Sequence, residues 1–115
     1  MTAEAGGAQE AAAWVRAARS AELSRGTLLR RVTRDGQTFP VLLWRTRRGT
    51  AVAIDARCPH RAFLMAGARI VRDTVECPLH GYRFGADGRC VNFRHAPAAR
   101  VVEVVEADGY LWLAL

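Results

Sequence analysis

Two short segments decide how this sequence is interpreted: Cys58-Pro59-His60-Arg61 and Cys77-Pro78-Leu79-His80-Gly81. Their pattern is C-x-H, then sixteen residues, then C-x2-H, so each segment supplies one thiolate and one imidazole. Two thiolates and two imidazoles are enough to hold a single tetrahedral metal ion or a pair of tetrahedral ions. Most zinc patterns pair two cysteines or two histidines within one segment, whereas each segment here mixes the two. The pattern therefore predicts a metal centre and leaves a structural zinc site as an alternative.

The residues beside these ligand candidates narrow the choice of metal. Proline follows both cysteines, and glycine and Tyr82 follow the second histidine. With these neighbours the segments resemble the Rieske [2Fe-2S] motif, in which two cysteines hold one iron and two histidines hold the other. The resemblance implies one [2Fe-2S] cluster per chain, bound by Cys58, His60, Cys77 and His80. Segments this short suit two tight loops that approach a cluster from opposite sides.

The mixed ligand set has a consequence for the chemistry. Two neutral imidazoles in place of two thiolates remove two negative charges and raise the potential to roughly −150 to +300 mV. The iron bound by histidine is the one expected to take the electron. We therefore expect His60 and His80 to lie nearest the solvent, where an electron leaves.

The neighbouring residues also indicate a branch of the family. Rieske proteins of the cytochrome bc type have two further cysteines that form a disulfide, and the corresponding places here are Phe63 and Leu79. That branch also has a serine where this chain has Tyr82. The chain therefore resembles the low-potential branch, which comprises Rieske-type ferredoxins and the N-terminal domain of ring-hydroxylating non-haem iron oxygenases. The resemblance extends from about Trp14 to Leu115.

The rest of the sequence is typical of short strands. Three Asp-Gly pairs, which favour hairpin turns, begin at Asp35, Asp87 and Asp108. Propensity favours a helix around Trp14, but the resemblance implies a strand over residues 14–17. We expect an all-β, Rieske-type antiparallel sandwich or barrel with a small cluster-binding subdomain made of the two loops. The expected strands are 14–17, 27–33, 38–44, 50–55, one or two within 68–76, 82–84, 89–93, 101–106 and 110–115.

Length and composition predict a single domain. The 115 residues divide into a flexible N-terminus, 1–12, and one Rieske [2Fe-2S] domain, 13–115. No stretch approaches the ~20 apolar residues of a membrane span, and the first residues do not form a signal peptide. With two cysteines assigned as ligands, Cys90 is left unpaired, which fits a reducing cytoplasm. We expect a cytoplasmic protein with no membrane partner.

The net charge of +6 comes from seventeen basic residues, all of which are arginine. A basic face could dock an acidic redox partner, with Arg61 beside the cluster as a candidate contact. A genomic preference for arginine codons explains the same composition. No nucleic-acid-binding motif is present.

The chain lacks the residues of a second catalytic centre. Besides the ligand candidates only His95 remains, too few for a two-histidine, one-carboxylate iron site, and we expect it in a loop. No nicotinamide fingerprint or small-molecule site is evident. The sequence predicts a ferredoxin component that takes single electrons from a reductase and delivers them to an oxygenase-type terminal enzyme. The alternatives are the electron-input domain of an oxygenase alpha subunit, separated from its catalytic iron domain, and a zinc-stabilised binding module.

Overall fold

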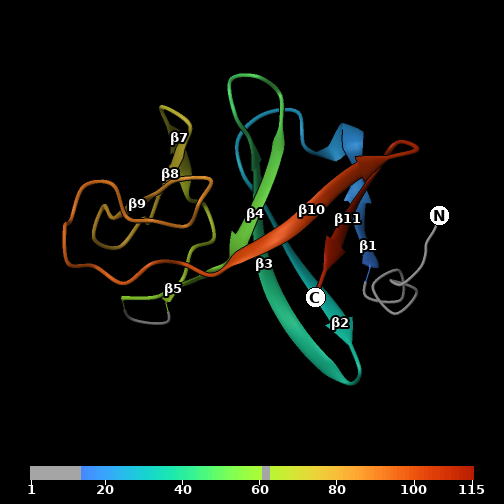
Figure 1. Ribbon diagram of the computed structural model, residues 1–115, viewed down its shortest axis with the longest axis horizontal. Coiled ribbons are helices and arrows are strands. Elements are labelled where there is room, and N and C mark those ends of the chain that lie inside the picture. Colours follow the sequence, from blue (N-terminus) through green and yellow to red (C-terminus); the bar gives the residue numbers. More distant parts are fainter. Residues whose placement is uncertain (1–13, 61–62) are drawn as a thin grey trace.

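The computed structural model describes residues 14–60 and 63–115, and strands dominate it (Figure 1). The elements are β1 (Trp14–Arg19), η1 (Ser20–Glu22), β2 (Leu28–Arg34), β3 (Gln37–Arg45), β4 (Ala51–Asp55), β5 (Arg57–Cys58), β6 (Phe63–Leu64), β7 (Arg69–Val71), β8 (Thr74–Glu76), β9 (Arg83–Phe84), β10 (Val101–Ala107) and β11 (Tyr110–Ala114). The predicted N-terminal segment 1–12 lies outside the described residues.

Six strands form one antiparallel sheet in the order β1-β11-β10-β4-β3-β2. Its two outer strands, β1 and β2, also contact each other, so the sheet nearly closes into a barrel. Along β11 the buried side chains alternate with half-buried ones, as the two-residue period of a strand requires. The predicted all-β fold is confirmed, including the strand at Trp14 that propensity alone would have made helical.

The first and third Asp-Gly pairs form the predicted hairpin turns. Asp35-Gly36 joins β2 to β3, and Asp108-Gly109 joins β10 to β11. All four residues have positive φ, between 52° and 82°. Two consecutive left-handed residues define the turn that matches the twist of paired strands, and Asp-Gly adopts it readily.

The stretch 68–76 forms two strands, β7 and β8, joined by Arg72-Asp73. Both turn residues have positive φ, 50° and 67°, without a glycine. The Asp73 carboxylate accepts a hydrogen bond from the Arg47 backbone N–H at 2.8 Å, and its carbonyl accepts one from the Trp44 indole at 3.3 Å. These bonds hold the turn and attach the hairpin to the large sheet.

The prediction of a strand over 89–93 is wrong. After Asp87-Gly88 only an isolated bridge forms, between Phe84 and Cys90. The pairing ends there because the Arg83 backbone N–H donates to the side chain of Asn92, at 3.0 Å, rather than to a backbone carbonyl. The chain then continues as a long loop to β10.

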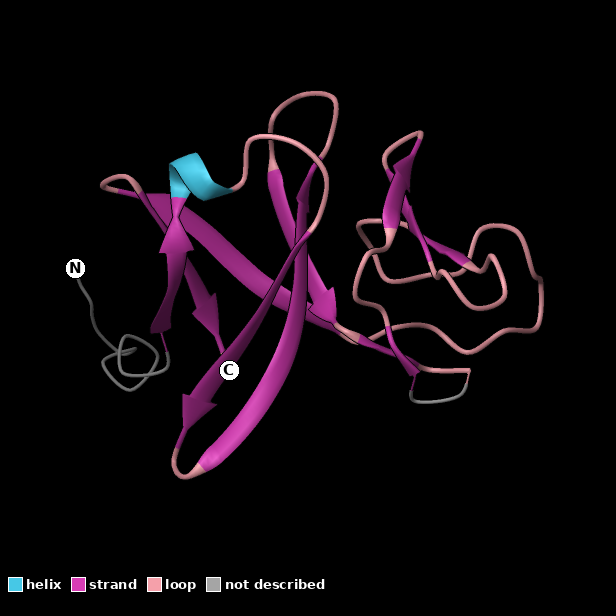
Figure 2. Ribbon diagram, turned by 180° about the vertical axis from the view of Figure 1, so that it is seen from behind, coloured by secondary structure: helices cyan, strands magenta, loops and turns pink. Residues whose placement is uncertain are grey.

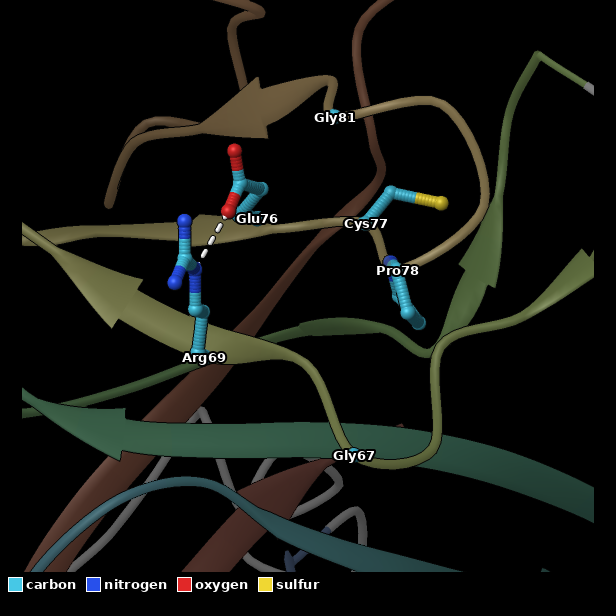
Figure 3. A pocket seen from close by; sticks show the side chains of 6 residues that line it. All are labelled: Gly67, Arg69, Glu76, Cys77, Pro78 and Gly81. Atoms are coloured by element: carbon cyan, nitrogen blue, oxygen red, sulfur yellow. Dashed lines mark hydrogen bonds and ion pairs between the residues drawn. The ribbon is translucent and has the colours of Figure 1, made fainter.

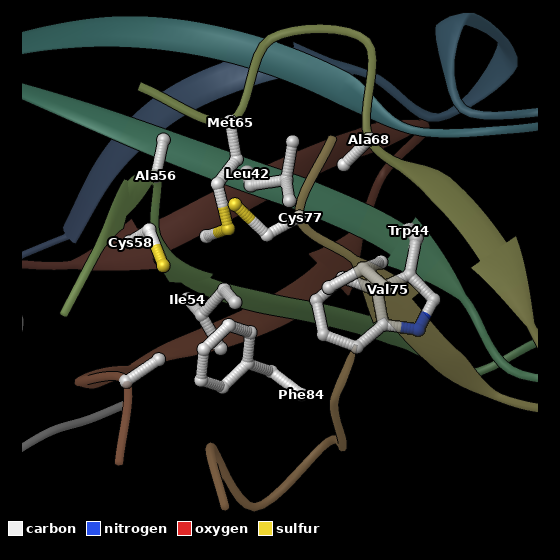
Figure 4. Packing of buried hydrophobic residues seen from close by; sticks show 11 residues of the cluster. Leu42, Trp44, Ile54, Ala56, Cys58, Met65, Ala68, Val75, Cys77 and Phe84 are labelled. Atoms are coloured by element: carbon white, nitrogen blue, oxygen red, sulfur yellow. The ribbon is translucent and has the colours of Figure 1, made fainter. Parts of the chain in front are cut away.

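Residues from β5 to the loop before β10 form a second lobe beside the six-stranded sheet, as Figures 1 and 2 show from opposite sides. A buried apolar cluster joins the two lobes (Figure 4). The sheet contributes Leu42, Trp44 and Ile54, and the second lobe contributes Val75 and Phe84. Trp44 is fully buried in this cluster. A separate cluster fills the barrel itself. In the described residues no helix has the length and apolar character needed to span a membrane.

One ion pair ties β3 to β10. The guanidinium of Arg45 donates to both carboxylate oxygens of Glu106 at 2.8 Å. This hydrogen bonding from Arg45 lowers the pKa of Glu106 from the ordinary 4.5 to about 2. The charged carboxylate therefore stabilises the fold above pH 4.5, and that contribution is lost as the pH falls from 4.5 towards 2.

We expect Glu106→Gln to weaken this acid dependence, because glutamine has no proton to gain. Urea midpoints followed by circular dichroism should fall with pH more steeply in the wild type than in Glu106→Gln between pH 4.5 and 3. Glu103→Gln removes an exposed carboxylate of β10 that has no ion pair within the described residues, and should follow the wild type. Parallel curves for the wild type and Glu106→Gln would contradict the assignment.

Candidate metal centre

Cys58 and His60 lie in the first of the two predicted loops. Cys58 is the last residue of β5 and pairs in register with Phe63 of β6. His60 follows two positions later, at the start of the turn between these strands. Arg61, the predicted docking residue, lies outside the described residues.

The second loop runs from Cys77 to Tyr82 and is closed by its own backbone. The Cys77 N–H donates to the Tyr82 carbonyl at 2.7 Å, and the Gly81 N–H donates to the Cys77 carbonyl at 3.0 Å. Gly81 has a φ of +73°, a conformation that L-residues with a side chain rarely adopt. The sequence Cys-x2-His-Gly therefore folds as a tight loop that returns the chain directly into β9.

The four candidate side chains separate into a buried pair and an exposed pair. Cys58 and Cys77 are only 2% and 1% exposed and belong to the apolar cluster that joins the two lobes, together with Met65 (Figure 4). His60 and His80 are both exposed. Their ring centroids lie 5.1 Å apart with the planes nearly perpendicular, at 85°. The imidazoles thus face the solvent, as expected, and the thiols face the core.

Two aromatic residues pack beside the two exposed histidines. The Tyr82 ring lies 4.5 Å from the His60 ring and 6.3 Å from the His80 ring, measured between centroids. The Tyr82 ring also packs against Phe93, with the two ring centroids 4.4 Å apart. Tyr82 therefore packs against both exposed histidines. The contribution of Phe93 was not predicted, because no local pattern links it to a loop that ends eleven residues earlier.

A groove with charged side chains lies against the second loop, which forms part of its lining (Figure 3). It has a volume of about 340 Å³ and is lined by Gly67, Arg69, Glu76, Cys77, Pro78 and Gly81. The Glu76 carboxylate accepts from Arg69 at 2.6 Å and from Arg83 at 3.4 Å. The hydrogen bond from Arg69 is the main cause that lowers the pKa of Glu76. The groove therefore carries an internally paired carboxylate next to the thiol of Cys77.

The donor set fits a [2Fe-2S] cluster of the mixed type. Such a cluster needs two thiolates for one iron and two imidazoles for the other. The loops provide a buried thiol pair and an adjoining exposed imidazole pair. None of the three cysteines, all within the described residues, is in a disulfide. Within residues 14–60 and 63–115 no three His, Cys, Asp or Glu side chains form a group around a single point.

The fold and the paired loops define an all-β domain with a candidate metal centre on two loops. A family model of the Rieske [2Fe-2S] domain matches residues 13–106. The chain belongs to the Rieske [2Fe-2S] domain family.

Curated relatives place the chain near oxygenases. It is 32% identical over 108 residues to the oxygenase component of dicamba O-demethylase from Stenotrophomonas maltophilia, covering 88% of this chain and 31% of that protein. It is 36% identical over 107 residues to cholesterol 7-desaturase from Bombyx mori, covering 87% of this chain and 23% of that protein. The chain therefore spans less than a third of either relative.

Comparison with solved structures finds the same kind of relative as the sequence comparison. The crystal structure of dicamba monooxygenase bound to dicamba superimposes with a TM-score of 0.78 at 32% identity. The match covers 89% of this chain and 33% of that one. The shared part thus corresponds to one domain of a larger protein.

Proposed function

We propose that this domain carries single electrons through a Rieske [2Fe-2S] cluster. In this proposal Cys58 and Cys77 hold one iron, and His60 and His80 hold the other. The single observation that supports it best is the division of the four side chains into a buried thiol pair and an exposed imidazole pair on two adjacent loops. When bound, the cluster supplies a one-electron redox couple.

The protein residues around the site have distinct tasks. The apolar surroundings of Cys58 and Cys77 exclude water from the thiolates. The exposed rings of His60 and His80 allow a partner to approach the redox centre closely. Because imidazole is a neutral ligand, these two residues also keep the negative charge of the site low, which favours acceptance of an electron.

The acceptor we propose is the mononuclear iron centre of an oxygenase-type enzyme. The relatives named above include an oxygenase component, and this chain matches less than a third of their length. This favours the role of an electron-input domain that works beside a catalytic iron domain. A ferredoxin component that receives electrons from a reductase is the second role that fits the same chemistry. In either role we propose that the domain acts in the cytoplasm.

Transfer to a partner tests this proposal. Dithionite-reduced protein, freed of excess reductant, should be reoxidised in a single one-electron phase by a ferredoxin-dependent oxygenase if the domain acts as a ferredoxin. A coding sequence that continues into a two-histidine, one-carboxylate iron site would support the electron-input role. Purified protein that takes up no electron from dithionite would contradict both roles and would favour the zinc-stabilised module.

A further inference from the structure

The segment from Cys90 to Phe93 is hydrogen-bonded to the second loop and to β9 without forming a strand. We propose that Asn92 is a positioning residue of the metal centre, which holds Tyr82 against the ring of His60 and so fixes the orientation of that imidazole. The inference rests on the proposed function, because it concerns how a ligand of the cluster is held.

The side chain of Asn92 bonds to the peptide groups on both sides of Tyr82. Its amide nitrogen donates to the Gly81 carbonyl at 2.8 Å. Its amide oxygen accepts from the Arg83 backbone N–H at 3.0 Å. One residue earlier, the Val91 backbone N–H donates to the Arg83 carbonyl at 2.9 Å. The Asn92 side chain therefore continues the pairing to β9 at the point where the backbone leaves it.

The two bonds explain why an asparagine suits this position. Gly81 presents an oxygen and Arg83 presents an N–H, so a side chain that serves both must be a donor and an acceptor at once. A carboxamide has both groups, whereas a carboxylate only accepts. An aspartate here would direct a negative oxygen at the Gly81 carbonyl, and an alanine would leave both groups without this partner.

The same segment contacts the Tyr82 ring. Phe93, directly after Asn92, packs on Tyr82 at 4.4 Å between centroids, and Tyr82 in turn packs on His60 at 4.5 Å. Asn92 thus fixes the backbone of Tyr82 while Phe93 fixes its ring. The Cys90 thiol also donates to the Asn92 amide oxygen at 3.3 Å, which adds a third bond to the side chain.

Groups of this kind, which orient a metal ligand without touching the metal, typically change metal affinity 10–100-fold when they are removed. We therefore expect Asn92→Ala and Asn92→Asp to lose the cluster at least about tenfold faster than the wild type in the presence of an iron chelator. Both should also shift the g-values of the reduced cluster in electron paramagnetic resonance, which a loss of general stability would not move.

Two further variants make the test specific. Val91→Asp adds the same charge one residue away, at an exposed side chain, and leaves the amide bonds intact. It should keep the wild-type g-values and rate of cluster loss. Phe93→Ala removes the ring contact but leaves Asn92 in place, and it should shift the g-values as the Asn92 variants do. Phe93→Ala leaves the hydrogen bonds of Asn92 intact. It therefore still tests whether Tyr82 orients the His60 ring if an Asn92 variant does not fold.

The outcomes separate this inference from the proposed function. Wild-type protein without a [2Fe-2S] signal would overturn the proposed function. A wild type with the signal, and Asn92 variants with the same g-values and rate of loss, would overturn only the positioning role. Unchanged g-values in Phe93→Ala would overturn the link through Tyr82.

Discussion

Replacing either Cys58 or Cys77 by alanine is expected to abolish the visible absorption of the cluster. Each cysteine supplies one of only two thiolates, and both thiols are almost fully buried in the apolar cluster between the lobes. Because ligation and folding are coupled in small metal-binding units, the second lobe should lose order as well. Iron content should fall from about two per chain to near zero, measured together with the absorption spectrum.

The third cysteine offers the matched control. Cys90 lies outside the two loops, and its thiol donates to Asn92. Cys90→Ala leaves both proposed thiolates in place, so it should keep the visible spectrum and the iron content. An unchanged spectrum in Cys58→Ala or Cys77→Ala would refute the ligand assignment, since each variant lacks one of the two proposed thiolates.

The second large effect is a change in the midpoint potential of the cluster when His80 is replaced by cysteine. If a cluster survives in His80→Cys, its midpoint potential should fall by roughly 100 mV or more, because a negative thiolate replaces a neutral imidazole. The estimate follows from the gap between mixed clusters, at about −150 mV or above, and four-thiolate ferredoxins near −400 mV. A redox titration followed by visible absorption measures it.

His95 provides the comparison for this variant. It lies in an exposed turn beyond the second loop, as expected for a residue that is not a ligand. His95→Cys introduces the same residue without changing the proposed donor set, so its potential should equal that of the wild type. A rise in the potential of His80→Cys would contradict the charge argument.

The two loops and most of the sheet could be predicted because their signals are local. The Cys-x-His and Cys-x2-His-Gly segments contain their own turn residues, and the Asp-Gly pairs at Asp35 and Asp108 define their hairpins without help from distant parts of the chain. The strand at Trp14 required the resemblance to the family, since its composition favours a helix.

The errors and omissions have a physical cause in long-range contacts. The strand predicted after Asp87-Gly88 fails because the Asn92 side chain occupies the backbone N–H of Arg83. Nothing in the local sequence marks the Arg72-Asp73 turn, which depends on bonds to Arg47 and Trp44 on another strand. For the same reason the roles of Asn92 and Phe93 could be inferred only from the structure.

The electron paramagnetic resonance spectrum of anaerobically purified, dithionite-reduced protein tests the central claim most directly, with iron, sulfide and zinc quantified on the same sample. The account predicts a Rieske-type signal with about two irons and two sulfides per chain. The absence of that signal, with zinc bound instead, would contradict it and would make the four side chains ligands of a structural site.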